Sequence, residues 1–155
     1  MFSAVLVVGL LPNYAHSLTL EDLGETEKQA YTQQQNQWVK EYEEEQERQR
    51  KTKELTEKAN SLKGKYGGQC VIFAKKFLGV TESWGLARNV KTNTSTPVIG
   101  SVIKTSESWA GHVGIVINAT KTTVTIIESN YIRNTIGIRT LSITDKRIKG
   151  YKIIN

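Results

Sequence analysis

The sequence predicts an α+β domain preceded by a long helix. Three observations lead to this prediction: residues 25–62 are rich in Glu, Gln, Lys and Arg and lack Pro and Gly, residues 70–78 have the pattern of a short apolar helix, and β patterns dominate after Pro97. With 155 residues, the chain has room for one ordinary domain and its extensions. We therefore expect a Cys-bearing helix packed on an antiparallel sheet, preceded by a long solvated helix.

The first twenty residues have the features of an export signal. An uninterrupted apolar run from Ala4 to Leu11 is followed by small residues two apart, Ala15 and Ser17, which is typical of an h-region and a cleavage site. The run is too short for a stable membrane span, and no Lys or Arg precedes it. We expect residues 1–20 to be either a signal peptide or a weak anchor.

Residues 21–63 are predicted to form a long charged helix. Strong helix formers fill the segment, and Glu44/Arg48 is one of several pairs in which the acid stands four positions before the base, the favourable order on a helix surface. Apolar residues are sparse, and none occurs from Glu43 to Lys53. A sustained coiled-coil seam is therefore absent. We expect a spacer or weakly self-associating stalk at 25–62, and the alternative is a solvated helix with no special role.

The domain at 64–155 is predicted to be the catalytic part of the chain. Gly64, Gly67 and Gly68 end the long helix, and a short helix at 70–78 follows them. The later β patterns predict an antiparallel meander. Its expected strands are 98–104, 112–118, 123–128, 136–143 and 148–154.

Composition limits the chemistry and the partners. One Cys excludes an internal disulfide framework, and with two His it is too small a set for a structural zinc site without carboxylates; no metal or cofactor is expected. The net charge of +6 is uneven: residues 1–60 carry seven basic against eleven acidic residues, and residues 61–155 carry fourteen against four. A basic domain favours an anionic partner, such as nucleic acid, a membrane surface or a cell wall. Nucleic acid is disfavoured because the basic residues are spread out with few aromatic residues between them.

The only Cys and one of the two His are the candidates for chemistry. Cys70 follows Gln69 at the start of the predicted helix, where free amides and the helix dipole lower the pKa of a thiol. His112 opens an apolar strand after Gly111, and an imidazole there could take the thiol proton and later protonate a leaving amine. The alternatives are a buried structural Cys and a strand-edge His bonded to backbone. Because each of the two residues stands at the end of a predicted helix or strand, a catalytic Cys–His pair is favoured over these alternatives.

A carboxylate in the next strand is expected to orient the imidazole. If a three-residue turn at 119–121 joins two antiparallel strands, Glu128 lies opposite His112, and a slip of two residues would place Asn130 there instead. Either register gives the imidazole an acceptor that fixes its tautomer and stabilises the imidazolium. The alternative for Glu128 is a solvated strand end, but it is one of only four acidic residues after residue 60.

Five short motifs occur in order after the long helix. They are Gly68-Gln69-Cys70, Trp84-Gly85, Pro97-x-x-Gly100-x-Val102, Gly111-His112-Val113-Gly114-Ile115-Val116 and Glu128-Ser129-Asn130. Together, over residues 64–154, this set resembles the CHAP family, the cysteine, histidine-dependent amidohydrolases/peptidases. The resemblance implies a papain-like fold and hydrolysis of an amide bond in peptidoglycan, either by an N-acetylmuramoyl-L-alanine amidase or by an endopeptidase.

The resemblance also implies roles for single residues. By motif, Cys70 is the nucleophile, His112 the general base and Glu128 the orienting residue, assisted by Asn130. The residues expected to bind substrate or the oxyanion are Gln69, Trp84, Trp109 and Gly111. The chain lacks the second tryptophan that commonly follows Trp84-Gly85 in this family, and we expect Trp109 to fill part of the groove.

The expected reaction is thiol-dependent hydrolysis. A thiolate attacks a peptide carbonyl, the imidazolium protonates the departing amine, and water releases the acyl group, while the backbone N–H of Cys70 binds the oxyanion. The expected partners are peptidoglycan and its anionic polymers. We expect a protein that is secreted or associated with the cell wall, or one that is phage-encoded and released at lysis, as an endolysin is. The alternatives are a papain-like acyl transferase and a non-catalytic wall-binding or adaptor module.

Overall fold

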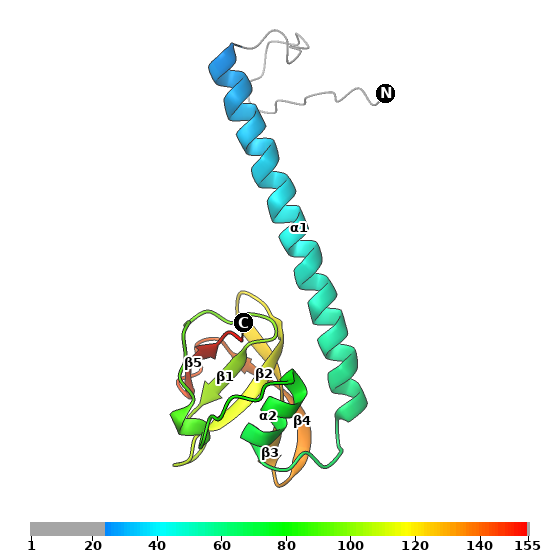
Figure 1. The fold of residues 1–155 in the computed structure, drawn as a ribbon, viewed down its shortest axis with the longest axis vertical. Coiled ribbons are helices and arrows are strands. Elements are labelled where there is room, and N and C mark those ends of the chain that lie inside the picture. The colour runs from blue at the N-terminus through cyan, green and yellow to red at the C-terminus, as the bar shows by residue number, and fades with distance from the viewer. Residues whose placement is uncertain (1–23, 155) are drawn as a thin grey trace. The chain divides into compact units, whose positions relative to one another are not determined.

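A long helix, a short helix and a five-stranded antiparallel sheet follow one another along the chain (Figure 1). The computed structural model describes residues 24–154, so the expected export segment at 1–20 lies outside the described residues. The elements are α1 (Glu25–Leu62), α2 (Cys70–Leu78), the 3-10 turn η2 (Ala87–Asn89), β1 (Val102–Thr105), β2 (His112–Ala119), β3 (Thr123–Ile132), β4 (Thr135–Ser142) and β5 (Ile148–Lys152). The predicted α+β class is confirmed; α2 has its predicted bounds, and α1 lies within the predicted range 21–63.

The sheet has the strand order β4-β3-β2-β1-β5. Strands β1 to β4 form the expected meander, but β5 returns to pair with β1 instead of following β4. Leu141 of β4 and Tyr151 of β5 belong to strands at opposite edges, and yet they pack in the same apolar cluster, so the sheet curls around it. We call this the inner cluster. Its other buried members are Ile103, Val116, Val124 and Ile126.

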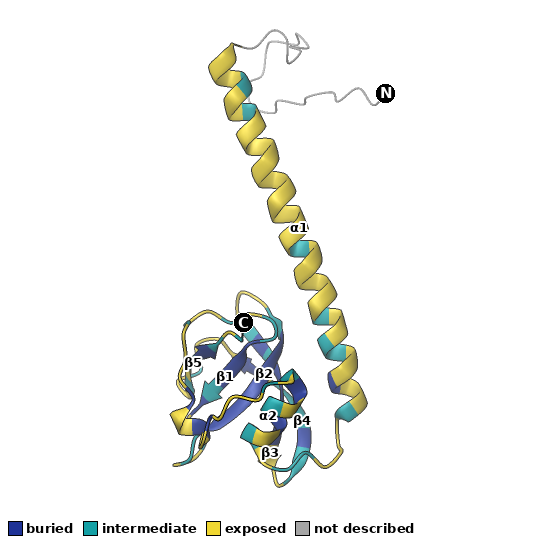
Figure 2. Cartoon of the chain, in the orientation of Figure 1, coloured by how far each residue is buried: buried dark blue, intermediate teal, exposed yellow. Residues whose placement is uncertain are grey.

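Helix α2 packs against the other face of the sheet. Its buried side chains Phe73, Ala74 and Phe77 join a second apolar cluster, the helix-side cluster, which includes Val113 of β2. The helix ends at Gly79, whose left-handed conformation (φ 69°) directs its N–H to the carbonyls of the last turn. Figure 2 shows the buried positions of the sheet and of this helix.

The end of α1 belongs to the same unit as the sheet. The chain forms two compact units, residues 1–45 and 46–155. In the second unit Ala59 is fully buried, and Leu55 and Leu62 pack against the helix-side cluster. Lys58 donates a hydrogen bond from Nζ to the carbonyl of Phe77 at 2.7 Å. Residues 46–62 of α1 therefore contribute directly to the core around α2.

The first unit, described from residue 24, is a solvated stretch of α1. Trp38 and Tyr42 are 72% and 65% exposed, and Figure 2 shows that most of this stretch is exposed. Lys40 pairs with Glu44 at 3.8 Å. Such exposure suits the solvated helix that the sequence predicts. Self-association through residues 25–62 stays a prediction.

The hairpin of β2 and β3 has a different register from the first one predicted. Gly114, not His112, lies opposite Glu128. This is the alternative register, in which the strands slip by two residues. The turn is longer than expected because the Thr120 hydroxyl accepts the N–H groups of residues 122 and 123. A β-bulge between Val116 and Asn118 adds one more residue to β2. The two features together shift the register by two residues, so Glu128 stays on the face of the sheet that was predicted for it.

Candidate active site

Cys70 is the first residue of α2, as the sequence predicts. The chain reaches it through Gly68, whose φ of 66° lies in the left-handed region that glycine tolerates. Ser129 of β3 is fully buried and donates from Oγ to the Gly68 carbonyl at 2.7 Å. At Gly67 a Cβ would overlap the Ser129 hydroxyl and Ile136. Tight packing against the sheet therefore fixes the segment that presents the thiol.

His112 is the first residue of β2, and it is 6% exposed. The preceding Gly111 has φ 72°, and a Cβ there would lie 2.8 Å from the backbone nitrogen of Arg88. The N–H of Arg88 donates to the Ala110 carbonyl at 2.7 Å, which joins η2 to the loop before β2. Glycine is thus required at 111 by close backbone approach, as its place beside the histidine suggests.

Glu128 lies in β3, beside His112 across the β2–β3 ladder. Its Oε2 is 2.9 Å from Nε2 of His112, and only 2% of the residue is exposed. Gly114 makes room for the carboxylate, because a Cβ there would lie 3.3 Å from the Cβ of Glu128. Since Nε2 faces Glu128, Nδ1 is the ring nitrogen left to face Cys70. The structure thus brings Cys70, His112 and Glu128 together in one array.

The pKa values of these three groups are shifted toward the charged forms. Burial raises the pKa of the Cys70 thiol, but its hydrogen bond to His112, the imidazolium charge and the N–H groups of Val113 and Val71 outweigh burial and lower it below 9.0. Burial lowers the pKa of His112, but bonds and charges from Cys70 and Glu128 outweigh burial and raise it from 6.5 to about 9. Both shifts therefore favour a thiolate beside an imidazolium.

The pKa of Glu128 is lowered although the carboxylate is buried. Burial alone raises it, and hydrogen bonds from His112 and Arg139 overcome that effect. Arg139 of β4 was not among the predicted site residues. A signal for it was present in the sequence: Arg139 stands two positions before Leu141 on a strand and so shares a face with a core residue. A charge on such a face needs a buried partner.

Two other predicted residues are exposed near the candidate nucleophile and base. Gln69 occupies the N-cap position of α2 without a side-chain cap bond, and it lines a groove of about 630 Å³ with Tyr66 and Ile72. Trp109 is 76% exposed in the loop before β2, and the Arg88 guanidinium lies 5.1 Å from its ring centre. Both positions suit contact with a bound substrate.

Trp84 and Asn130 are used differently from the prediction. Trp84 is only 6% exposed, packs in the helix-side cluster and donates from Nε1 to Glu82 at 3.0 Å. Its ring is therefore a core element and does not line a groove. Asn130 has φ 69°, and its Oδ1 accepts the N–H of Asn134 at 2.8 Å. This contact stabilises the β3–β4 turn.

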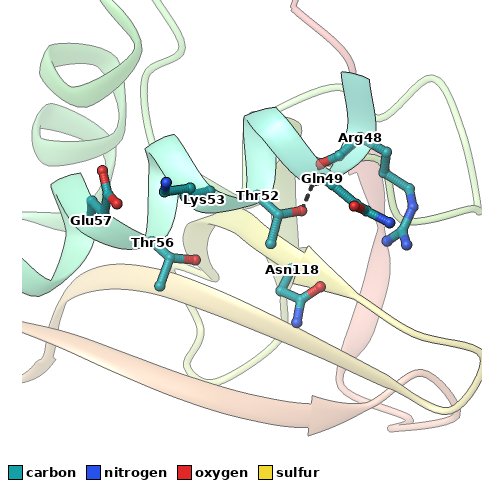
Figure 3. Close-up of a pocket in the computed structure, with 7 residues that line it drawn as sticks. All are labelled: Arg48, Gln49, Thr52, Lys53, Thr56, Glu57 and Asn118. Atoms are coloured by element: carbon teal, nitrogen blue, oxygen red, sulfur yellow. Dashed lines mark hydrogen bonds between the residues drawn. The ribbon is translucent and has the colours of Figure 1, made fainter. Parts of the chain in front are cut away.

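A second groove lies away from these residues. It has about 470 Å³ and runs between residues 48–57 of α1 and Asn118 of β2, and Figure 3 shows its lining. None of the predicted site residues lines it. Within residues 24–154, no three His, Cys, Asp or Glu side chains gather as metal ligands would. Across the same residues, no helix combines the length and apolarity of a bilayer span.

One comparison with known proteins, that with family models, agrees with the motifs. The family model described as the CHAP domain matches residues 57–130, a range that includes Cys70, His112 and Glu128. The crystal structure of Ly7917 is similar, with 19% sequence identity and a TM-score of 0.49 over 60% of this chain. The chain spans 58% of the length of that protein chain. No curated protein matches the chain. Residues 57–130 therefore match the CHAP domain, the domain of a family of peptidoglycan amidases and peptidases that are generally hydrolases.

Proposed function

We propose that this protein cleaves an amide bond of peptidoglycan with Cys70 as the nucleophile. The observation that carries the proposal is the contact array of Cys70, His112 and Glu128, in which the thiol pKa is lowered and the imidazole pKa is raised to about 9. A buried structural cysteine has no need of a charged imidazole beside it. The same array argues against a non-catalytic module, for which three matched groups serve no purpose.

The chemistry has two steps. The Cys70 thiolate attacks the carbonyl carbon, and the negative oxygen is stabilised by the backbone N–H of Cys70, one of the first-turn amides that have no intrahelical partner. The Gln69 side chain, exposed at the N-cap position, is a second donor. His112 then gives its Nδ1 proton to the departing amine, leaving an acyl thioester on Cys70. In the second step His112 takes a proton from water, the hydroxide attacks the thioester, and the thiolate is released. Throughout, Glu128 holds Nε2 and stabilises the imidazolium.

The surroundings of the array suit a cell-wall substrate. The fourteen basic and four acidic residues after residue 60 favour association with anionic wall polymers. Trp109 is exposed three residues before His112, and Gln69 lines a groove next to Cys70, so both are proposed to contact the peptide or sugar beside the cleaved bond. We propose that the bond is either the muramoyl-alanine amide or an amide within the peptides. For such a substrate the protein acts outside the cytoplasm, by secretion or by release at lysis.

The test compares the parent chain with Cys70→Ala on purified peptidoglycan. Because Cys70 is the only cysteine, iodoacetamide applied to the parent gives a second, independently modified form. We expect the parent to lower turbidity and release new amino groups, and both modified forms to release none while keeping the parent circular dichroism spectrum. Mass spectrometry of the released muropeptides then names the bond. Equal release by parent and Cys70→Ala would rule out the thiol mechanism, and sedimentation with walls without new ends would favour a binding module.

A further inference from the structure

We infer that Arg139 is a positioning residue that holds the Glu128 carboxylate against His112; the inference rests on the proposed function. Arg139 lies on β4, beyond the residues 57–130 that the family model matches. Its Nε donates to Oε1 of Glu128 at 2.8 Å, and its Nη2 donates to Oε2 at 3.0 Å. Such a two-point contact fixes the plane of a carboxylate as well as its position.

The plane of the carboxylate matters because one of its oxygens is shared. Oε2 of Glu128 accepts from Arg139 and also lies 2.9 Å from Nε2 of His112. Rotation of the carboxylate would break both contacts with Arg139 and move Oε2 from the imidazole. With the carboxylate fixed, Nε2 carries the proton that faces Glu128, and Nδ1 is directed to Cys70. A lysine cannot reproduce this two-point contact, because its ammonium is a point charge.

Besides Glu128, two other residues hold Arg139 in place. Its Nη1 donates to Oε1 of Glu107 at 2.8 Å, and its guanidinium lies 4.0 Å from the ring centre of Tyr131. Glu107 in turn accepts from Arg147 at 3.2 Å. Only 16% of the Arg139 side chain is exposed. The guanidinium is therefore ordered before any substrate arrives.

Arg139 also supplies the charge that makes a buried carboxylate stable. The charged and titratable groups around Glu128 are His112 of β2 and Arg139 of β4, with Tyr131 and the Lys63 side chain lining the same cavity of about 440 Å³. Cys70 faces His112 from α2. Without the guanidinium, burial raises the pKa of Glu128, and protonation of Glu128 in acid removes the counter-charge of the imidazolium. The thiolate and imidazolium pair is then lost at a higher pH than in the parent.

The test replaces Arg139 by Met, with Arg147→Met as the matched control. Both residues bind Glu107, but only Arg139 binds Glu128. For Arg139→Met we expect kcat on peptidoglycan to fall about 100-fold, the loss that follows a small misplacement of a catalytic group. We expect its KM, and both constants of Arg147→Met, to stay within about twofold of the parent. An equal loss of kcat in Arg147→Met would overturn the inference.

The rate of Cys70 alkylation by iodoacetamide as a function of pH gives a reading without substrate. In acid this rate falls, and we call that part of the profile the acid limb. In Arg139→Met the acid limb should move up by about one pH unit, because an opposite charge beside the Glu128 carboxylate shifts the pKa of that carboxylate by at least that much. An unmoved acid limb overturns the inference. This arm decides the role of Arg139 even if the parent releases no muropeptide, an outcome that would refute the proposed function alone.

A double variant separates positioning from direct contact with substrate. If Arg139 acts only through Glu128, Arg139→Met combined with Glu128→Gln should be within about twofold of Glu128→Gln in kcat. Losses that multiply would mean that Arg139 acts on the substrate itself and would overturn the inference. If the methionine variant fails to fold, Arg139→Lys replaces it in the test. This variant should keep the acid limb of the parent but not its kcat, because lysine keeps the positive charge and lacks the two-point contact of the guanidinium. Full kcat in Arg139→Lys would count against positioning.

Discussion

Replacing Glu128 by Gln should lower the pKa of His112 while preserving the shape of the site. Glu128 is 2% exposed, and its Oε2 lies 2.9 Å from Nε2 of His112. Burial lowers the pKa of His112, and it is the contacts with Cys70 and Glu128 that raise it to about 9. Glutamine has the size of glutamate and an oxygen for the same hydrogen bond, but it has no charge. The substitution therefore removes the electrostatic part of the contact.

The magnitude follows from the size of the shift. A rise from 6.5 to about 9 corresponds to roughly 3 kcal/mol, at about 1.4 kcal/mol for each pKa unit. This is a net value, because burial acts against it and Cys70 supplies part of the favourable contribution, so it sets no upper limit on the share of Glu128. Loss of one adjacent opposite charge shifts a pKa by about 1–3 units, and we expect the pKa of His112 to fall by at least about one unit. The imidazolium would then be mostly deprotonated at a pH where the parent keeps it.

The same shift gives the sign of the stability change with pH. A raised histidine pKa stabilises the folded chain fully below 6.5, and the stabilisation is lost as the pH rises through about 9. Glu128→Gln should therefore reduce the free energy of unfolding most below about pH 6.5, at pH values where Glu128 is still ionised in the parent. Above about pH 9 the difference between variant and parent should shrink to the part that comes from the lost contact with Arg139.

Nuclear magnetic resonance of the imidazole nitrogens measures this pKa without substrate. The control is Glu107→Gln, which removes another partly buried carboxylate that binds Arg139 and Arg147 and not His112. We expect Glu107→Gln to leave the pKa of His112 within about half a unit of the parent. The reasoning fails if Glu128→Gln leaves that pKa unchanged, or if Glu107→Gln lowers it as far.

Three further predictions follow from single contacts. In the parent, the rate of hydrolysis should fall above about pH 9, where His112 loses its proton. It should also fall in acid, at a pH below the ordinary thiol pKa of 9.0, where the Cys70 thiolate gains a proton. A pH–rate profile with only one of these two limbs contradicts this prediction. Gly67→Ala should lower the free energy of unfolding by about 1–3 kcal/mol in urea titrations, because its Cβ overlaps buried atoms, whereas Gly137→Ala, with open space at its Cβ, should not. Thr105→Val should stabilise the chain by about 1 kcal/mol in the same titrations, because the buried Thr105 hydroxyl has no hydrogen-bond partner among the described residues; a loss of stability would show that the hydroxyl is bonded in solution.

The sequence was most informative where local chemistry decides the structure. Helix formers without Pro or Gly predict α1 with its observed bounds, and the glycines before Cys70 separate it from α2. The register of the β2–β3 hairpin was harder to predict. It depends on the Thr120 hydroxyl, which builds a longer turn, and on a bulge after Val116, and neither has a clear signature in the residue pattern. The position of β5 beside β1 depends on the curl of the whole sheet, which no local pattern reports.

Some residues of the candidate site could likewise be predicted from local sequence, and others could not. Cys70 and His112 could be predicted because each is scarce and stands at the end of an element. The structure places Trp84 in the core and not in the predicted groove: a tryptophan after a short helix suits both, and burial alone separates the two. Arg139 was missed because its partner Glu128 is on another strand. The contact becomes visible only when β3 and β4 are paired, with Glu128 opposite Gly137.

The position of His112 at the start of β2 explains how a helix and the far face of a sheet can serve one site. Cys70 packs with the helix-side cluster, whereas Glu128 alternates with Ile127 and shares its face of β3 with Ile126 of the inner cluster. A side chain in the middle of a strand contacts one face only. At the end of the strand, one imidazole can direct Nδ1 toward the helix side and Nε2 toward the inner side. The curl that brings β4 and β5 around the inner cluster also encloses Glu128 and Arg139, and this burial makes the charge of Arg139 necessary.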